Sequence, residues 1–205
     1  MLYGSHLPNC ITMLQEKFKN TEIILASQSP RRQELLKGLD INFKIETRPV
    51  NEVYSNDLKG AQITDYLSVL KADAFINDLK DDQLLITSDT IVWFNDAPLE
   101  KPKNDEHAID MITSMSGQVH EVFTSVCFTS TTQQAVINDC TKVHFANLTA
   151  AEIEYYVKTY QPMDKAGAYG IQDWLGYAAV TRLEGCYYNV MGLPLPKVYG
   201  FLKSL

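Results

Sequence analysis

The chain has 205 residues, of which 45% are hydrophobic and 21% charged, which are ordinary proportions for a globular protein. Its net charge of −7 argues against a large basic surface for DNA or RNA polymers, but it leaves room for a small basic pocket. No apolar run approaches the roughly 20 residues that span a bilayer, so we expect neither a nucleic-acid polymer nor a membrane as partner.

The N-terminal segment lacks the basic start and apolar centre of a signal peptide, so a cytoplasmic location is expected. The four cysteines and four histidines show none of the spacings typical of zinc or redox sites. We expect residues 1–20 to form an N-terminal extension, loose over residues 1–12, and residues 21–205 to form a single domain.

The first regular elements are a strand over 22–26 and a helix over 30–38. The apolar run that ends at Ala26 is typical of a buried strand. Pro30 stands at the favoured first position of the helix, and Gly38 ends it. A strand that turns directly into a helix places the turn between them at the end of a sheet.

Residues 27–32, Ser-Gln-Ser-Pro-Arg-Arg, make this turn. The first amides of a helix lack internal partners and lie at the positive end of its dipole, so Arg31 and Arg32 oppose that dipole unless an anion is near. The turn is therefore either an ordinary strand–turn–helix with solvated arginines or a polyphosphate site. In the second case Ser27, Ser29, Arg31 and Arg32 bind the phosphates.

Hydrophobic periodicity and turn residues predict the other elements. In chain order they are a strand over 42–48, a helix over 61–79, a strand over 84–94, a helix over 105–116, a hairpin of strands over 119–130 and 134–146, a helix opened by the capping box Thr149–Glu152, a strand over 177–183 and a helix from Pro194 whose buried residues include Leu205. This order predicts an α/β fold: a mixed twisted sheet flanked by helices, with two lobes around a central cleft.

Four charged residues are candidates for chemistry in that cleft. Asp89 comes just after the buried apolar part of its strand, residues 84–87, where a carboxylate either caps a turn or faces a cleft, binds a divalent cation or orients a water. Lys71 borders the apolar stripe of its helix, and Lys101 is held extended by the following proline; either is a solvated lysine or a phosphate ligand. Glu52 follows a proline-containing loop and is a weaker candidate.

The segment 164–172 combines small and polar residues. Its glycines and alanines let the backbone approach a ligand closely, and Gln172 offers an amide donor and an acceptor that suit the edge of a nucleobase. Two arginines, two lysines, two carboxylates and this loop together predict a site for a metal–triphosphate.

These residues resemble one known family. Residues 25–36, Leu-Ala-Ser-Gln-Ser-Pro-Arg-Arg-Gln-Glu-Leu-Leu, are similar to the opening signature of the Maf nucleoside triphosphate pyrophosphatases. The segments 88–92, 100–102, 115–117, 164–172 and 189–194 resemble its later motifs in the same order, and the resemblance covers residues 22–203. It implies an inosine triphosphatase-like fold and hydrolysis of nucleoside triphosphates to monophosphate and pyrophosphate with a divalent cation, Mg²⁺ or Mn²⁺.

The motif match also implies residue roles. Asp89 takes the place of the family's proton acceptor, and Arg31, Thr90 and Gln172 match positions tied to substrate choice. They resemble the branch that acts on dTTP and UTP, since the branch that prefers 7-methyl-GTP usually has tryptophan for Arg31 and glutamate for Gln172. Gln118 stands where arginine is frequent and Ser88 where alanine is usual, and Val50-Asn51-Glu52 departs from the family's usual aspartate-glutamate pair.

The resulting hypothesis is a water attack on the α-phosphorus, with Asp89, Lys71, Lys101 and Glu52 as the catalytic residues. Asp89 and Glu52 bind the metal, while Arg31, Arg32 and the two lysines neutralise phosphate charge. Two alternatives stay open: a nucleotide-binding regulator of septum formation without turnover, and a phosphatase that releases orthophosphate. A homodimer is also left open.

Overall fold

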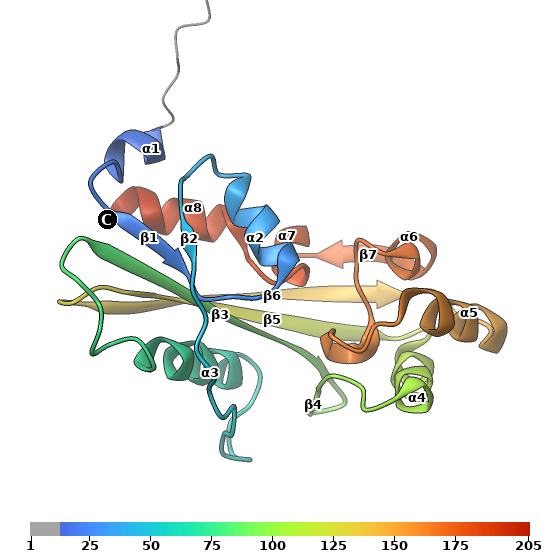
Figure 1. Ribbon diagram of the computed structural model, residues 1–205. Coiled ribbons are helices and arrows are strands. Elements are labelled where there is room, and N and C mark those ends of the chain that lie inside the picture. Colours follow the sequence, from blue (N-terminus) through green and yellow to red (C-terminus); the bar gives the residue numbers. More distant parts are fainter. Residues whose placement is uncertain (1–12) are drawn as a thin grey trace, which may run out of the picture.

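The structure is a computed structural model that describes residues 13–205 (Figure 1). The loose extension expected over residues 1–12 lies outside the described residues. Just after them, the short helix α1 (Met13–Lys17) buries Leu14 in an apolar core together with α2 and α8.

The described residues form one mixed seven-stranded sheet in the order β2-β1-β3-β5-β6-β7, with β4 added to β3. β1 runs parallel to β2 and β3, and the other pairs are antiparallel. The strands are β1 (Glu22–Leu25), β2 (Lys44–Ile45), β3 (Gln83–Phe94), β4 (Ala97–Leu99), β5 (Val119–Thr129), β6 (Gln134–Phe145) and β7 (Val180–Glu184). The three long strands β3, β5 and β6 form the spine of the molecule.

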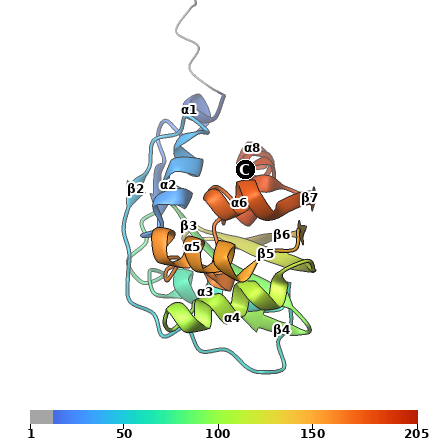
Figure 2. The same ribbon diagram turned by 90° about the vertical axis from the view of Figure 1, so that its right-hand side faces the viewer.

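Helices cover both faces of this spine (Figures 1 and 2). α2 and α8 lie on one face and α3 on the other. α4, α5 and α6 gather at the end of the sheet near β4, away from α1. They are α2 (Pro30–Lys37), α3 (Ala61–Asp73), α4 (Asp105–Met115), α5 (Ala150–Tyr160), the 3₁₀ helix η1 (Ala166–Ala168), α6 (Trp174–Ala179), α7 (Tyr187–Val190) and α8 (Leu195–Ser204). The predicted α/β architecture, with a mixed sheet flanked by helices, is confirmed. The longest of these helices, α3, has 13 residues, and none within 13–205 has the length and apolar character to cross a membrane.

Two main apolar cores occupy opposite ends of the sheet, and β3 contributes to both. Leu84 and Ile86 pack with α1, α2 and α8, whereas Val92 and Phe94 pack with α4 and α5. The polar run 87–90 lies between them on the same strand. Because β3 is polar where the cores separate, the molecule has two lobes with a hydrophilic boundary across the middle of its central strand.

Three elements differ from their predicted bounds by more than one residue. The strand expected over 42–48 pairs only at 44–45, because it lies at the edge of the sheet and is exposed there. The helix expected over 61–79 ends at Asp73 and continues in tight turns. Of the strand expected over 177–183, the first three residues belong to α6, in which Tyr177 is 79% exposed.

Several local signals agree with the structure, and one burial prediction does not. Pro30 begins α2, Gly38 caps it, and the Thr149–Glu152 capping box forms both of its hydrogen bonds. Leu205, expected to be buried, is 43% exposed, because α8 ends just before it and Val198 and Leu202 fill the core instead.

Candidate active site

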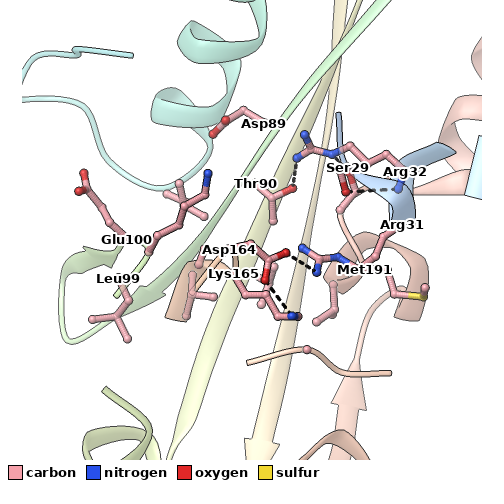
Figure 3. A pocket seen from close by; sticks show the side chains of 18 of the residues that line it. Ser29, Arg31, Arg32, Asp89, Thr90, Leu99, Glu100, Asp164, Lys165 and Met191 are labelled. Carbon is pink, nitrogen blue, oxygen red and sulfur yellow. Dashed lines mark hydrogen bonds and ion pairs between the residues drawn. The ribbon is translucent and has the colours of Figure 1, made fainter. Parts of the chain in front are cut away.

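A cavity of about 360 Å³ lies at the boundary between the lobes, a size typical of small-ligand pockets. Its wall is formed by the start of α2, the loop before α3, the end of α3, the middle of β3, the residues after β4, the loop before α6 and the link between α7 and α8 (Figure 3). Its basic side chains are Arg31, Arg32, Lys71, Lys101 and Lys165, and its acidic ones are Glu52, Asp89, Glu100 and Asp164. Every site residue proposed from the sequence lines this cavity except Ser27.

The two serines of the turn before α2 have different positions. Ser29 caps the helix, and its Oγ accepts a hydrogen bond from the Arg32 amide. Ser27 is buried behind the turn, where its Oγ accepts a hydrogen bond from the Ser29 amide and its carbonyl accepts one from Gln33. Ser27 therefore shapes the turn, and the cavity wall is formed by Ser29.

Arg32 is half-buried and hydrogen-bonded to neutral groups. Its Nε donates to the Gly192 carbonyl at 2.8 Å, and its two terminal nitrogens donate to the Ser88 carbonyl at 3.0 Å and the Thr90 hydroxyl at 2.9 Å. Burial lowers the pKa of Arg32, and the neighbouring charge of Asp89 acts in the opposite direction. Arg32 thus connects α2, β3 and the α7–α8 link and places a positive charge in the cavity wall.

Gly192 permits this close approach. Its φ of +105° is in a region that side chains with a Cβ rarely adopt. A Cβ at this position would lie 3.3 Å from Arg32 Nε and 3.4 Å from Thr90 Oγ1. The Thr90 hydroxyl continues the polar chain to Thr124 at 2.9 Å, and Thr124 donates to the carbonyl of the buried Asn189. The sequence motif over residues 189–194 therefore supports the floor of the cavity.

Asp89 and Lys71 are the two catalytic candidates in closest contact. The Asp89 side chain is 9% exposed, and its Oδ1 lies 2.6 Å from Lys71 Nζ. Glu52 Oε2 approaches the same ammonium at 3.2 Å. A lysine from α3, an aspartate from β3 and a glutamate from the loop before α3 are thereby brought together, as the sequence interpretation requires.

Several wall residues were not among the sequence candidates. Arg31 lies 3.4 Å from Asp164, which also contacts Lys165 at 2.9 Å. The Tyr54 hydroxyl donates to Glu100 at 3.1 Å, and burial followed by this contact raises the pKa of Tyr54 to about 12. Asp164 and Lys165 stand at the head of the small-residue loop that contains Gln172, and this charged pair was the signal available in the sequence.

The loop that bears Gln172 is held by buried aromatic groups. The Tyr156 hydroxyl accepts a hydrogen bond from the Gly170 amide and donates to Asp173, both at 3.0 Å. Tyr169 pairs with His120 Nε2 at 2.7 Å, and burial lowers the pKa of His120 to about 3. These contacts fix the backbone around Gln172, whose side chain lines the cavity.

The carboxylates of the cavity fit a hard divalent cation that arrives with a substrate. Within residues 13–205 no three His, Cys, Asp or Glu side chains are arranged as a complete metal site. Asp89 and Glu52 nevertheless converge on Lys71 in the cavity wall. A small hard cation binds one or two carboxylates and completes its coordination with waters and phosphate oxygens, so this donor set suffices.

Comparisons with known proteins point to one family. A dTTP/UTP pyrophosphatase of Christiangramia forsetii is 55% identical over 94% of this chain and 98% of its own length. A dTTP/UTP pyrophosphatase of Flavobacterium johnsoniae is 53% identical over 94% of this chain and all of its own length. Among solved structures, the Ham1 protein of Staphylococcus aureus aligns with 62% of this chain and 73% of its own, with 15% identity and a TM-score of 0.48. The Maf-like protein family matches residues 22–205, and the chain belongs to this family.

Proposed function

We propose that this protein hydrolyses nucleoside triphosphates, with dTTP and UTP favoured, to the nucleoside monophosphate and pyrophosphate. Two relatives named dTTP/UTP pyrophosphatase are 53–55% identical over nearly the whole chain. The observation that carries the proposal is the shared cavity, in which Asp89 of β3, Lys71 of α3 and Arg31 of α2 meet at the boundary between the lobes. We also propose that the protein acts in the cytoplasm, the location expected from the sequence.

Asp89 is the proton acceptor in the proposed reaction. Water attacks the α-phosphorus, its proton passes to the Asp89 carboxylate, and the bond between the α-phosphorus and the bridging oxygen to the β-phosphate breaks. Lys71 holds Asp89 through Oδ1, which fixes the orientation of the carboxylate. Arg31, Arg32, Lys71 and Lys101 supply positive charge for the triphosphate and for the pyrophosphate that leaves.

The metal proposed for this site is Mg²⁺ or Mn²⁺, held by Asp89 and Glu52. Both ions prefer the oxygen ligands that these side chains provide. When bound, the ion would neutralise phosphate charge and polarise the reacting phosphoryl group. Glu52 is 51% exposed at its side chain, so it serves as the outer carboxylate, and Asp89 as the inner one.

Base choice is assigned to Gln172, with Arg31 and Thr90 as contributors. The carboxamide of Gln172 can pair with the imide edge that thymine and uracil share. The Thr90 hydroxyl contacts Arg32 and Thr124, so Thr90 acts on substrate choice by positioning Arg32. The two nucleotides differ at the ribose 2′ position and at the base methyl group, and selection through the shared imide edge would admit both.

One experiment separates this proposal from its two alternatives. The pure protein is incubated with Mg²⁺ and a panel of nucleoside triphosphates, and the products are identified by anion-exchange chromatography. Monophosphate and pyrophosphate in equal amounts are the expected products. Orthophosphate without pyrophosphate would favour a phosphatase, whereas binding without any product would favour a nucleotide-sensing regulator.

A further inference from the structure

Asp164 bridges two cations that belong to different lobes. Its Oδ2 lies 3.4 Å from the Arg31 guanidinium on α2, and its Oδ1 lies 2.9 Å from Lys165 Nζ in the loop after α5. Figure 3 shows the three side chains together in the cavity wall, with Asp164 between the other two. One carboxylate thus presents one oxygen to each cation, as two oxygens of a phosphate group would.

The three side chains differ in how firmly they are held. The side chains of Arg31 and Lys165 are 27% and 13% exposed, so both belong to the wall. The Asp164 side chain is 64% exposed, and its contact with Arg31 is long for an ion pair. A solvated carboxylate at this distance contributes little to stability, so a stronger anion can displace it at small cost.

The deeper cations of the cavity are already committed to other groups. Arg32 donates to three neutral acceptors, and Lys71 contacts both Asp89 and Glu52. Lys165 also faces Asp173, but at 3.7 Å. Arg31 and Lys165 are therefore the pair of cations whose bridging partner is solvated and movable, while both cations remain in the wall when that partner leaves.

We propose that Lys165 is a phosphate-binding residue that acts together with Arg31, and that Asp164 occupies the position between them until the triphosphate displaces it. This inference rests on the proposed function for the identity of the substrate, but the binding of a polyphosphate tests it separately. It gives a role to a lysine that the sequence motifs left unassigned, and it makes Asp164 a built-in competitor of the substrate.

The charge of Asp164 supports this competition. Burial alone would raise its pKa, but the hydrogen bond from Lys165 and the charges of Lys165 and Arg31 outweigh burial and hold the pKa below its ordinary value. Asp164 is therefore ionised at neutral pH. Removal of its charge should strengthen polyphosphate binding, whereas removal of the Lys165 charge should weaken it.

The test measures inorganic tripolyphosphate, which has no base or sugar, by calorimetry and as an inhibitor of dTTP turnover. Lys165→Gln should weaken tripolyphosphate binding about tenfold and raise the KM for dTTP by a similar factor, and Lys165→Arg should restore most of both. Asp164→Asn should strengthen tripolyphosphate binding severalfold. Lys158→Gln, an exposed lysine of α5 paired with Glu154, is the matched control and should change neither value.

The outcomes distinguish the possible failures. Tripolyphosphate binding that is unchanged in Lys165→Gln, or weaker in Asp164→Asn, would overturn the inference. A loss of dTTP affinity without a loss of tripolyphosphate affinity in Lys165→Gln would place Lys165 at the base or sugar and would also overturn it. Calorimetry needs no turnover, so an absence of pyrophosphate production by the parent protein contradicts the proposed function and leaves this test intact.

Discussion

Lys71 Nζ lies 2.6 Å from Oδ1 of Asp89, which joins the last turn of α3 to the middle of β3. An ionised carboxylate has about four lone-pair sites, so a contact through one oxygen leaves capacity for a water proton or a cation. The lysine also counters the cost of holding a carboxylate on a side chain that is only 9% exposed. This pair therefore places a charged base at the point where the two cores of the sheet separate.

Replacement of Asp89 tests its proposed role as proton acceptor. Asp89→Asn keeps the size of the side chain but removes the base, so the kcat for dTTP should fall at least about 100-fold. The variant should remain folded, which its melting temperature and circular dichroism spectrum would check. Asp110→Asn, an exposed aspartate of α4, should retain parental activity. An Asp89→Asn protein with parental kcat would remove this residue from the mechanism.

The same substitution at the two adjacent arginines of α2 should have different effects. At Arg32 it should lower stability, and at Arg31 it should weaken the binding of dTTP. Arg32→Met removes three hydrogen bonds, to the Ser88 and Gly192 carbonyls and the Thr90 hydroxyl, so the free energy of unfolding should fall by at least about 2 kcal/mol. Arg31→Met removes a half-buried charge with one long ion pair, so stability should change by less than about 0.5 kcal/mol. The KM for dTTP should nevertheless rise about tenfold in Arg31→Met. Urea unfolding and steady-state kinetics measure both effects, and equal losses of stability would contradict this division.

This contrast also shows what the sequence can and cannot predict. The turn, the proline at the start of α2 and the polar run in β3 depend on near neighbours, so they are readable from the chain. Adjacent residues on a helix point about 100° apart, and only the docking of α2 on the sheet decides that Arg32 faces inward.

The same reason explains the residues that sequence reasoning missed. Tyr54 reaches the cavity through the packing of separate segments and has no local pattern that would reveal it. Glu100 and Lys165 lie within motifs that the sequence shows, but only the packing of these segments decides that their side chains line the cavity. The predicted strand over 42–48 was too long because pairing at an edge depends on the neighbouring strand and not on alternation alone. The sequence predicts Ser27 as a phosphate ligand because its residue type suits that role, whereas its side chain points into the turn.

Base choice can be tested at Gln172. Gln172→Glu replaces an amide donor with a carboxylate acceptor, which would repel the carbonyl oxygens of thymine and uracil. We expect kcat/KM for dTTP to fall by about tenfold or more, since one unmatched hydrogen bond is worth about 1–3 kcal/mol. The melting temperature should move little, because the loop is anchored by Tyr156 and Tyr169. Equal kcat/KM for dTTP and dCTP in the parent protein would show that this edge is not selected.

Two glycines offer a matched pair for the support of the cavity. Gly192→Ala places a Cβ against Arg32 and Thr90 at a φ of +105°, so it should destabilise the protein by about 1–3 kcal/mol. Gly200 is exposed within α8, and a Cβ there would meet no atom within 4 Å, so Gly200→Ala should stabilise the protein by about 0.5–1 kcal/mol. Thermal unfolding measures both, and a neutral Gly192→Ala would mean that the link between α7 and α8 can relax without cost.

His120 should make the protein sensitive to acid. Burial lowers its pKa from 6.5 to about 3, so the unfolded chain binds a proton between these values that the folded protein excludes. The stability from the neutral imidazole is complete above pH 6.5 and is lost as the pH falls toward 3.

From about pH 7.5 to 5, this group should therefore reduce the free energy of unfolding by about 2 kcal/mol. His120→Gln should lose that part of the pH dependence, whereas His144→Gln, at a histidine beside Glu184 on the same sheet, should keep it. Urea unfolding at the two pH values gives the difference, and the NMR signal of the His120 ring should stay constant over this range. A His120 signal that titrates near its ordinary pKa of 6.5 would show that the ring takes up its proton without unfolding.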